Sequence, residues 1–503
     1  MRINRKAFLQ IAAASIGAPR LAADALGEPD TKPKKVEKAA IKGATDAVAQ
    51  FIARTTLADL PGDVIQQGKR CLIDGFGVIL AGSTTEGSQI VREYVRTVSG
   101  KGEETVLGAK GLSAPAALAA LANGASGHAM DYDDTQLSTT PDRTFGLLTH
   151  PTVPALVASL AVAERSGASG ATFLEAFLIG FEVECKIAEA IDPEHYLRGF
   201  HSSGTIGTFG AAAAAAKLLK LDARQLAHML AIAASLASGI RVNFGSMTKP
   251  LHVGRAGENG VFAAEIAGKG FTGGDAGLDG EWGFFQILGS GADLDRLIPV
   301  LGKPYAIVNP GVSIKPYPCG SLSHPSMDAM LKVVVDHDLE PDQIKTVRVR
   351  AGSNVLNPLR YKTAKTELEA KFCLPFLMTS IILRRKAGIA EFTDAFVASE
   401  PVQRMMPRVT AVFDPAIEAR GFDKIRSIIE VDLADGRTLT QPADERYRGG
   451  PEKPFTREEL REKFADCAQA VLRPPRVREA LAAIESIDRL QSVRDLVRTL
   501  AAS

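Results

Sequence analysis

A run of six alanines at residues 211–216 is the feature that most constrains the fold of this 503-residue chain. Phe209 and Leu219 flank the run, and apolar residues continue through residues 230–240. Alanine has the highest helix propensity, and its small side chain lets neighbouring helices approach closely. The run therefore predicts a helix over residues 205–220 inside a helical bundle, rather than disordered low-complexity sequence.

Helical periodicity extends from about residue 44 to residue 301. After Pro61-Gly62-Asp63, a helix-start signal, apolar residues recur at helical spacing from Val64 to Ile79. Alanine-rich sequence after residue 115, with proline expected in the first turn, and residues 154–166 and 172–191 have the same character. A chain of this length exceeds one ordinary core. We therefore expect a large helical domain over residues 44–304.

The sequence changes character near Pro304. Residues 344–351 alternate apolar and charged side chains, which is typical of a strand with one face in water, and residues 409–413 share this pattern. Residues 427–433 and 437–440 flank a hairpin signal at 434–436, and helices are expected at 368–387 and 391–398. These elements predict a smaller α+β lid domain over residues 305–440. Residues 441–503 return to helical sequence, so the predicted fold class is mainly α with an inserted α+β domain.

Composition excludes several classes of function. The formal net charge of +1 gives no sign of a nucleic-acid partner. The five cysteines are scattered without a CxxC pair, so we expect no disulfide framework, zinc site or iron–sulfur cluster, and we predict no metal and no other cofactor. No run beyond the N-terminus reaches the ~20 apolar residues of a membrane helix, so no membrane partner is expected.

The N-terminal segment has the order of an export signal. Arg2, Arg5 and Lys6 precede a weakly apolar run, and residues 23–25 have the small residues of a cleavage site. Residues 4–10 resemble a twin-arginine signal with lysine in place of one arginine. We expect residues 1–25 to direct export to the periplasm and residues 26–43 to be a linker. The alternatives are a basic tail or a start site placed too far upstream, either of which leaves a cytoplasmic protein.

Asp131, Asp133 and Asp134 form an acidic segment. Carboxylates this close repel one another unless other groups use or separate them. We expect a helix end that brings Asp131 and Thr135 to a site, with His150 arriving from the following loop. The alternatives are a solvated acidic turn or a calcium loop, but the regularly spaced oxygen ligands and closing glutamate of a calcium loop do not follow.

Three later segments carry basic side chains near expected helix starts or the domain junction. His201 precedes glycines at every third position, which is not dinucleotide-binding spacing and indicates close helix packing. Lys249 and Arg255 lie in a glycine-punctuated loop that suits a polycarboxylate, and Lys315 and His324 lie at the domain junction. The alternatives are a capping or core histidine at position 201 and a surface turn at residues 249–255.

Six motifs, in order along the chain, resemble the MmgE/PrpD family: DYDDT, THP, FHSSGTIGTFGAAAA, TKPLHVGRA, KPYPCGSLSHP and EAKFCLPF. The likeness runs from about residue 45 to the end, and the family includes 2-methylcitrate dehydratases, cis-aconitate decarboxylases and iminodisuccinate epimerases. It implies a helical domain with an inserted lid, in a homodimer that needs no metal. The active site it implies comprises Asp131, Thr135, His150, His201, Lys249, Lys315 and Tyr361.

The chain departs from the family pattern in three places that bear on the substrate, one of which is the absence of the tryptophan and histidine that close the region around Gly320 in dehydratases and decarboxylases. The loop between Thr135 and His150 is longer than in decarboxylases. Gly320 stands where some decarboxylases have a histidine. These departures affect the choice of substrate rather than the family.

The combined residues predict an enzyme. Loss of water or CO₂ from a polycarboxylate builds negative charge beside a carboxylate, which Lys249 and Lys315 would stabilise and Arg255 could help to stabilise. His150 or His201 would move the proton, Asp131 would orient a neighbour, and Tyr361 would donate a hydrogen bond from the lid. We expect a cofactor-independent lyase, either a dehydratase or a decarboxylase, acting on a small di- or tricarboxylate such as a 2-methylcitrate- or aconitate-like acid. The alternatives are an isomerase or epimerase that abstracts a proton next to a carboxylate, and a binding protein without activity. The expected substrate-binding residues are Thr135, Lys315, Arg255 and His324.

Overall fold

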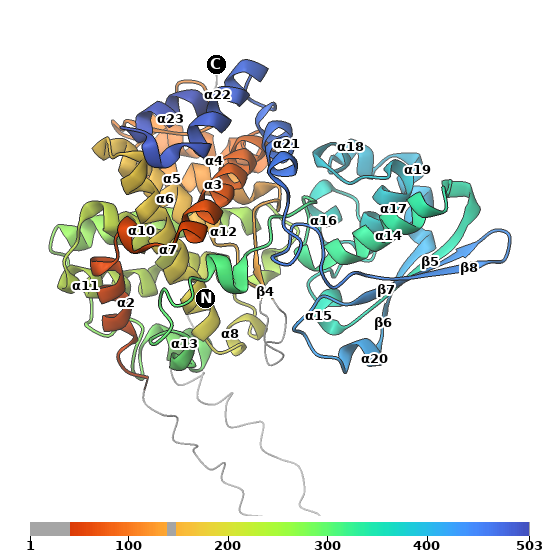
Figure 1. Ribbon diagram of the computed structural model, residues 1–503, viewed down its shortest axis with the longest axis horizontal. Coiled ribbons are helices and arrows are strands. Elements are labelled where there is room, and N and C mark those ends of the chain that lie inside the picture. Colours follow the sequence, from red (N-terminus) through yellow and green to blue (C-terminus); the bar gives the residue numbers. More distant parts are fainter. Residues whose placement is uncertain (1–40, 138–146, 502–503) are drawn as a thin grey trace, which may run out of the picture. The chain divides into compact units, whose positions relative to one another are not determined.

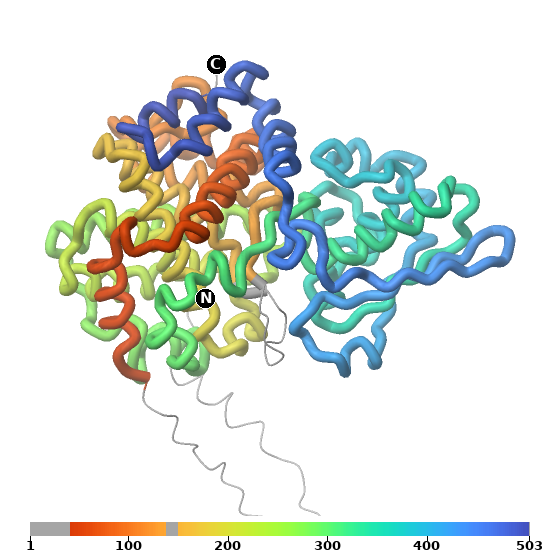
Figure 2. The backbone as a smooth tube through the Cα atoms, viewed as in Figure 1, coloured from red at the N-terminus to blue at the C-terminus, as the bar shows by residue number. Residues whose placement is uncertain are grey.

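The computed structural model describes residues 41–137 and 147–501, and these described residues form one compact unit (Figures 1 and 2). The predicted export signal, most of the predicted linker and residues 138–146 of the loop before His150 lie outside the described residues. Two parts are distinguished below. The helical part comprises residues 44–289 and 457–500, and the α+β part comprises residues 324–442.

Long helices build the helical part, and shorter elements connect them. The long helices are α2 (Ala44–Arg54), α3 (Gly62–Gly82), α4 (Glu86–Val98), α5 (Ala116–Ala129), α6 (Thr152–Ser166), α7 (Gly170–Ala190), α10 (Gly207–Leu219), α11 (Ala223–Leu236) and α12 (Thr248–Gly268). The shorter elements are α8 (Glu194–Leu197), α9 (Ser202–Thr205), α13 (Phe284–Gly289) and the strands β1 (Glu104–Thr105), β2 (Ser113–Ala114), β3 (Gln136–Leu137) and β4 (Leu147–Thr149).

The alanine run lies at the centre of this bundle. Helix α10 packs against α6, α7 and α12, and residues 211–216 are fully buried. A Cβ atom at Gly180 of α7 would lie 2.5 Å from the carbonyl oxygen of Gly210 of α10, so this crossing requires glycine. The structure confirms the predicted buried helix and divides its sequence into α9 and α10. It also places Pro115 at the N-cap of α5, one position before the expected first turn.

The α+β part contains a four-stranded sheet in the order β6-β5-β7-β8. Its strands are β5 (Ile344–Ala351), β6 (Val409–Phe413), β7 (Ser427–Leu433) and β8 (Thr438–Pro442). Strand β5 is parallel to β6, with Val347 beside Val409, and antiparallel to β7, with Val349 beside Ile429. Strands β7 and β8 form the predicted antiparallel hairpin. The fold class is therefore mainly α with an α+β part, as the sequence predicts.

Helices pack on the apolar side of this sheet. Helix α14 contacts β7 and β8, and α17 contacts β6 (Figure 1). Alternate residues of β5 and β7 are buried, while Arg348 and Arg350 on the other side pair with Glu430. The helices of this part are α14 (His324–Asp336), α15 (Ser353–Leu356), α16 (Glu367–Ala370), α17 (Leu374–Arg384), α18 (Asp394–Val397), α19 (Glu400–Met405) and α20 (Pro415–Glu418).

The C-terminal helices α21 (Arg457–Ala468), α22 (Pro474–Glu485) and α23 (Val493–Leu500) pack on the helical part. Helices α21 and α22 contact α3, and α23 contacts α6. Thr456 and Glu459 form a capping box at the start of α21. Buried Lys463 of α21 lies 2.6 Å from Asp74 of α3 and donates a hydrogen bond to the carbonyl of Tyr132. The C-terminal tail thus supports the acidic segment.

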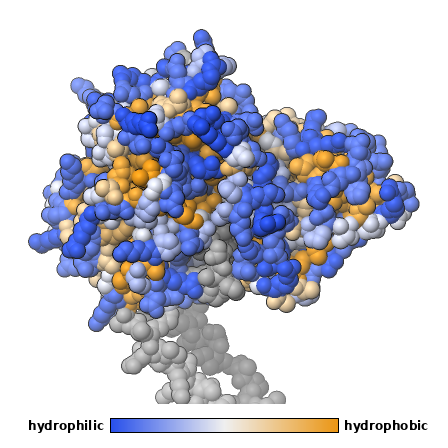
Figure 3. Space-filling model, viewed as in Figure 1, coloured by the Kyte–Doolittle hydropathy of each residue, from blue (hydrophilic) through white to orange (hydrophobic). Residues whose placement is uncertain are grey.

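Apolar residues are not confined to the interior. On the face shown in Figure 3, hydrophobic patches lie among hydrophilic residues over both parts. Among the described residues, no helix combines the length and the apolar character needed to cross a membrane.

Candidate active site

Asp131 connects two buried lysines. Helix α5 ends at Ala129, and Asp131 then adopts a left-handed conformation with φ 50°, which aspartate tolerates better than most residues. Its Oδ1 accepts hydrogen bonds from Lys249 Nζ at 2.9 Å and from Lys315 Nζ at 2.7 Å. Burial alone would raise the pKa of Asp131, but the two ammonium groups hold it well below its usual value. Asp131 is therefore ionised and neutralises one of two buried positive charges.

The two lysines come from different parts of the chain. Lys249 is the second residue of α12, and Lys315 follows the extended residue Ser313, which pairs with Thr135. Lys249 also lies 2.8 Å from His128 Nε2, and Lys315 also donates to the carbonyl of Asp131 at 2.9 Å. An ammonium group has three N–H donors. Each lysine therefore keeps one N–H that no hydrogen bond among the described residues uses.

The other two carboxyl groups of the acidic segment have separate partners. Asp133 lies 2.8 Å from His128 Nδ1 and 3.6 Å from His150 Nδ1. Asp134 accepts hydrogen bonds from the backbone N–H of Thr152 at 3.2 Å and from its hydroxyl at 2.7 Å. Burial raises the pKa of Asp134 to about 7, whereas the two histidines hold the pKa of Asp133 below its usual value despite burial. The segment is thus neither a solvated turn nor a set of equivalent carboxylates.

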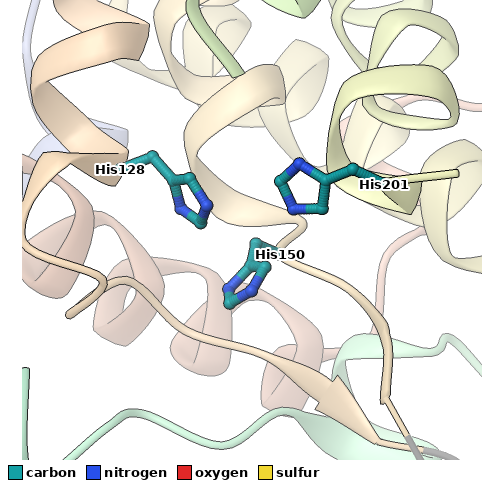
Figure 4. A group of neighbouring side chains, drawn as sticks. All are labelled: His128, His150 and His201. Carbon is teal, nitrogen blue, oxygen red and sulfur yellow. The ribbon is translucent and has the colours of Figure 1, made fainter. Parts of the chain in front are cut away.

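Three histidines enter the same space from three segments (Figure 4). His128 lies in the last turn of α5, His150 follows β4, and His201 precedes α9. The ring centre of His128 lies 4.7 Å from that of His150 and 5.6 Å from that of His201. Burial lowers the pKa of all three, most strongly for His150 and His201. The three imidazoles are therefore neutral near neutral pH.

Hydrogen bonds at Nδ1 orient the rings of His150 and His201. His150 Nδ1 lies 2.8 Å from the carbonyl oxygen of Asp134, which can only accept, so Nδ1 carries the proton of His150 and Nε2 is a free base. His201 Nδ1 lies 3.0 Å from His252 Nδ1. The buried Nε2 of His201 makes no hydrogen bond within the described part of the chain. That nitrogen is consequently free for a ligand.

The histidine cluster has some features of a metal site. Ligand atoms of His128, His150 and His201 lie within 4.8 Å of one another, and neutral imidazoles are common ligands of transition metals. However, the ammonium of Lys249 lies 2.8 Å from His128 Nε2. Because a metal ion bound to that nitrogen would have to displace an existing positive charge, the described arrangement fits a lysine better than a metal.

A small cavity adjoins the two lysines. Asp131, His150, Lys249 and Lys315 line its charged side. About 30 Å³ is open to a water-sized molecule, which is room for roughly one or two waters. The remaining wall comes from the helical part, the α+β part and the segment before α14. The apolar wall residues include Tyr196, Phe244, Leu322, Leu359 and Phe372.

Besides His201, four predicted residues lie outside the cavity wall. Thr135 is buried and lies 3.1 Å from the hydroxyl of Ser321, which does line the cavity. Buried His324 lies 3.3 Å from the carbonyl oxygen of Cys319. Tyr361 donates to the carbonyl of Phe244 at 3.2 Å and thereby links the two parts, instead of pointing at the cavity. The fourth residue, Arg255, does not join the buried cluster.

Arg255 is exposed because of its position on α12. Its guanidinium pairs with Glu258 on the same helix, at 2.5 Å, and its side chain is 49% exposed. Lys249, His252, Val253 and Ala256 form the buried face of α12, at helical spacing. Position 255 lies off this face, so Arg255 adds no charge to the cavity of its own chain.

The structure adds residues that the sequence analysis missed. His128 lies in the last turn of α5, three residues before Asp131, and this closeness in sequence to the acidic segment was the signal that could have identified it. The rings of Phe244 and Phe372 lie 5.3 and 5.4 Å from Lys249 Nζ, within the range of a cation–π interaction. Phe372 lies within the EAKFCLPF motif without being singled out there, and no sequence signal marks Phe244.

Fold and site together define a class of protein. A helical bundle and an α+β part adjoin a buried cluster of lysines, carboxylates and neutral histidines, which is equipped for acid–base chemistry on a small anion. Comparison with known families identifies the family within this class. Residues 46–297 match the MmgE/PrpD N-terminal domain and residues 317–489 match the MmgE/PrpD C-terminal domain. The chain belongs to the MmgE/PrpD family.

Similar proteins include several named for one activity. The chain is 28% identical to the human cis-aconitate decarboxylase over 471 residues, which is 92% of this chain and 95% of that protein. It is 28% identical to the mouse cis-aconitate decarboxylase, over 92% of this chain and 94% of that protein. It is 24% identical to a cis-aconitate decarboxylase-like protein of Aspergillus oryzae, over 90% of this chain and 96% of that protein. The family and these relatives support an enzyme of the lyase type.

Proposed function

We propose that the protein is a cofactor-independent lyase that removes CO₂ or water from a small, aconitate-like di- or tricarboxylate. The observation that carries the proposal is the convergence of Lys249 and Lys315 on one oxygen of Asp131, at 2.9 and 2.7 Å, beside a cavity. Two ammonium groups and one carboxylate leave one excess positive charge on the cavity wall. A substrate carboxylate supplies the missing negative charge.

The two remaining N–H groups give this charge a catalytic use. Loss of CO₂ breaks a carbon–carbon bond and leaves an electron pair on carbon, and loss of water follows removal of a proton from carbon. In both reactions the negative charge spreads onto an adjacent carboxylate. The free N–H groups of Lys249 and Lys315 are placed to bind its two oxygens, and burial strengthens that interaction.

A histidine supplies the proton step. His150 lines the cavity, and its Nε2 is unprotonated because Nδ1 donates to Asp134. In dehydration, this nitrogen takes the proton from carbon, and the imidazolium so formed returns a proton to the departing hydroxide, which leaves as water. In decarboxylation, a proton must instead reach the carbon that has lost CO₂. His201 does not line the cavity, but its unused Nε2 belongs to the same histidine cluster, with its ring centre 6.4 Å from that of His150, and it is the second group of this cluster that can exchange a proton.

Proton NMR in D₂O tests the proposal with a panel of citrate-, aconitate- and aspartate-like acids. We expect loss of CO₂ or of water from one acid. Loss of CO₂ brings deuterium from the solvent into the product, whereas loss of water removes a proton from carbon and adds none. The names of the relatives make cis-aconitate the first acid to test. Lys315→Met is the variant to compare with the wild type, because it removes one ammonium but keeps a buried side chain of similar length. Equal turnover by this variant would contradict the proposal, and inversion without loss of a group would replace the lyase with an epimerase.

A further inference from the structure

His128 lies between a lysine and a carboxylate in the centre of the site. Its side chain is buried, with 1% of the residue exposed. Its Nε2 lies 2.8 Å from Lys249 Nζ, and its Nδ1 lies 2.9 and 2.8 Å from the two carboxylate oxygens of Asp133. His128 does not line the cavity, so it acts on a substrate only through Lys249.

These contacts determine which nitrogen of His128 carries the proton. Lys249 also donates to the ionised Asp131, and an ammonium group can only donate. The Nε2 atom of His128 must then accept, so it carries no hydrogen. The ring is neutral, which puts its one N–H on Nδ1, where it meets the carboxylate of Asp133. Both contacts are therefore satisfied by the same tautomer, and by no other neutral form.

We propose that Asp133 and His128 are a positioning pair that holds the ammonium of Lys249 and directs its remaining N–H into the cavity. Asp133 fixes the tautomer of His128, and His128 Nε2 then takes one N–H of Lys249. Asp131 takes a second N–H, and the rings of Phe244 and Phe372 flank the ammonium. The orientation of Lys249 is set before any substrate binds, which is the preorganisation that electrostatic catalysis requires.

Two amide variants of His128 distinguish the acceptor role of its Nε2 from the donor role of its Nδ1. Gln at position 128 can place its amide oxygen where Nε2 lies and accept from Lys249, whereas Asn reaches only the Nδ1 position and bonds Asp133. Both amides are neutral, and they differ by one methylene. Because this part of the inference rests on the proposed function, turnover is measured with the acid that the wild type converts. We expect His128→Gln to stay within about tenfold of wild-type kcat and His128→Asn to lose on the order of 10²-fold or more, as for other lost electrostatic donors.

The carboxylate is tested in the same way. In Asp133→Asn, the new amide can donate to Nδ1, so the proton of His128 moves to Nε2. An N–H at Nε2 cannot accept from the ammonium of Lys249, and their hydrogen bond is lost. We expect a kcat loss on the order of 10²-fold or more, as when a catalytic histidine is held in the wrong tautomer. KM should change much less than kcat, because the second lysine and its N–H are intact. His337→Gln, at an exposed histidine of the α+β part, controls for the loss of a histidine.

A spectroscopic measurement tests the pair without any substrate. The chain has eight histidines, so ¹⁵N-histidine labelling gives few signals, and those of His128 are identified by their absence in His128→Gln. We expect the Nδ1–H tautomer in the wild type and its loss in Asp133→Asn. An Nε2–H tautomer in the wild type would overturn the inference, whatever the activity. If no acid is turned over, the proposed function fails while the tautomer still decides this inference. Equal kcat in folded His128→Gln and His128→Asn would also overturn it, and if His128→Asn does not fold, the wild-type tautomer and Asp133→Asn still decide.

Discussion

Substituting Asp134 by asparagine removes a buried carboxyl group that changes its charge near neutral pH. Burial raises the pKa of Asp134 to about 7, whereas an aspartate in an unfolded chain titrates near ~3.9. Between these values the folded protein holds a proton that the unfolded chain has released. The resulting stability is therefore complete below about pH 3.9 and is lost as the pH rises through about 7.

The size of the effect follows from the difference in pKa. About 3 pKa units, at about 1.4 kcal/mol each, correspond to about 4 kcal/mol over the whole range, of which about 3 kcal/mol falls between about pH 5 and pH 8. Asparagine is neutral at every pH and can keep both hydrogen bonds with Thr152. We expect the free energy of unfolding of Asp134→Asn, relative to the wild type, to rise by about 3 kcal/mol across that interval.

Urea unfolding followed by far-UV circular dichroism measures this difference at several pH values. Circular dichroism is preferable to fluorescence because the single tryptophan, Trp282, is 82% exposed. Subtracting the two curves cancels the buried histidines, whose lowered pKa values make both proteins less stable as the pH falls below about 6.5. Asp275→Asn, at a side chain that is 93% exposed, should show no such trend. A difference between Asp134→Asn and wild type that stays constant from about pH 5 to pH 8 would refute the reasoning.

The remaining predictions concern the chemistry and the destination of the protein. His150→Ala should lower kcat by roughly 10²–10⁴-fold and Lys249→Ala by on the order of 10²–10³-fold, and the double variant should lose less than their product. Multiplicative losses would show that the two residues act in independent sites. Arg255→Ala should leave kcat within about twofold of wild type, because an exposed ion pair contributes little, and a larger loss would place Arg255 in a site. Dialysis against EDTA should leave turnover intact, and a loss restored by a divalent ion would contradict this. A reporter fused after Gly43 should be exported, and its retention in the cytoplasm would disprove the export signal.

Local sequence patterns predict the fold well where burial repeats along one element. The alternation in residues 344–351 corresponds to β5, with Val347 and Val349 facing the helices. The alanine run corresponds to α10, because small side chains at every position leave a buried helix as the stable solution. Such patterns do not specify how the two parts meet. The contact of Tyr361 with the carbonyl of Phe244 depends on loops that are 117 residues apart in sequence.

Residues of the candidate site could be proposed from the sequence where a charged side chain lies within an apolar or glycine-rich segment. Lys249 and Lys315 lie among apolar and glycine-rich sequence, and both are buried. Arg255 was misplaced because the glycines around it suggested a loop, whereas residues 248–268 form α12. Helical spacing from Lys249 would have put position 255 on the solvent side. His128 was overlooked because its partners, Lys249 and Asp133, become neighbours only when the chain turns at Asp131.

That turn also explains why three carboxyl groups within four residues can serve three different purposes. The left-handed conformation of Asp131 separates its side chain from those that follow, so Asp131 meets two lysines, Asp133 meets His128 and Asp134 meets Thr152. The first two stay ionised, because cationic or donating neighbours lower their pKa more than burial raises it. Asp134 lacks a cation and retains its proton up to about pH 7. Were all three ionised, mutual repulsion would disfavour the fold, so the neutral Asp134 helps two carboxylates to orient Lys249, Asp131 directly and Asp133 through His128.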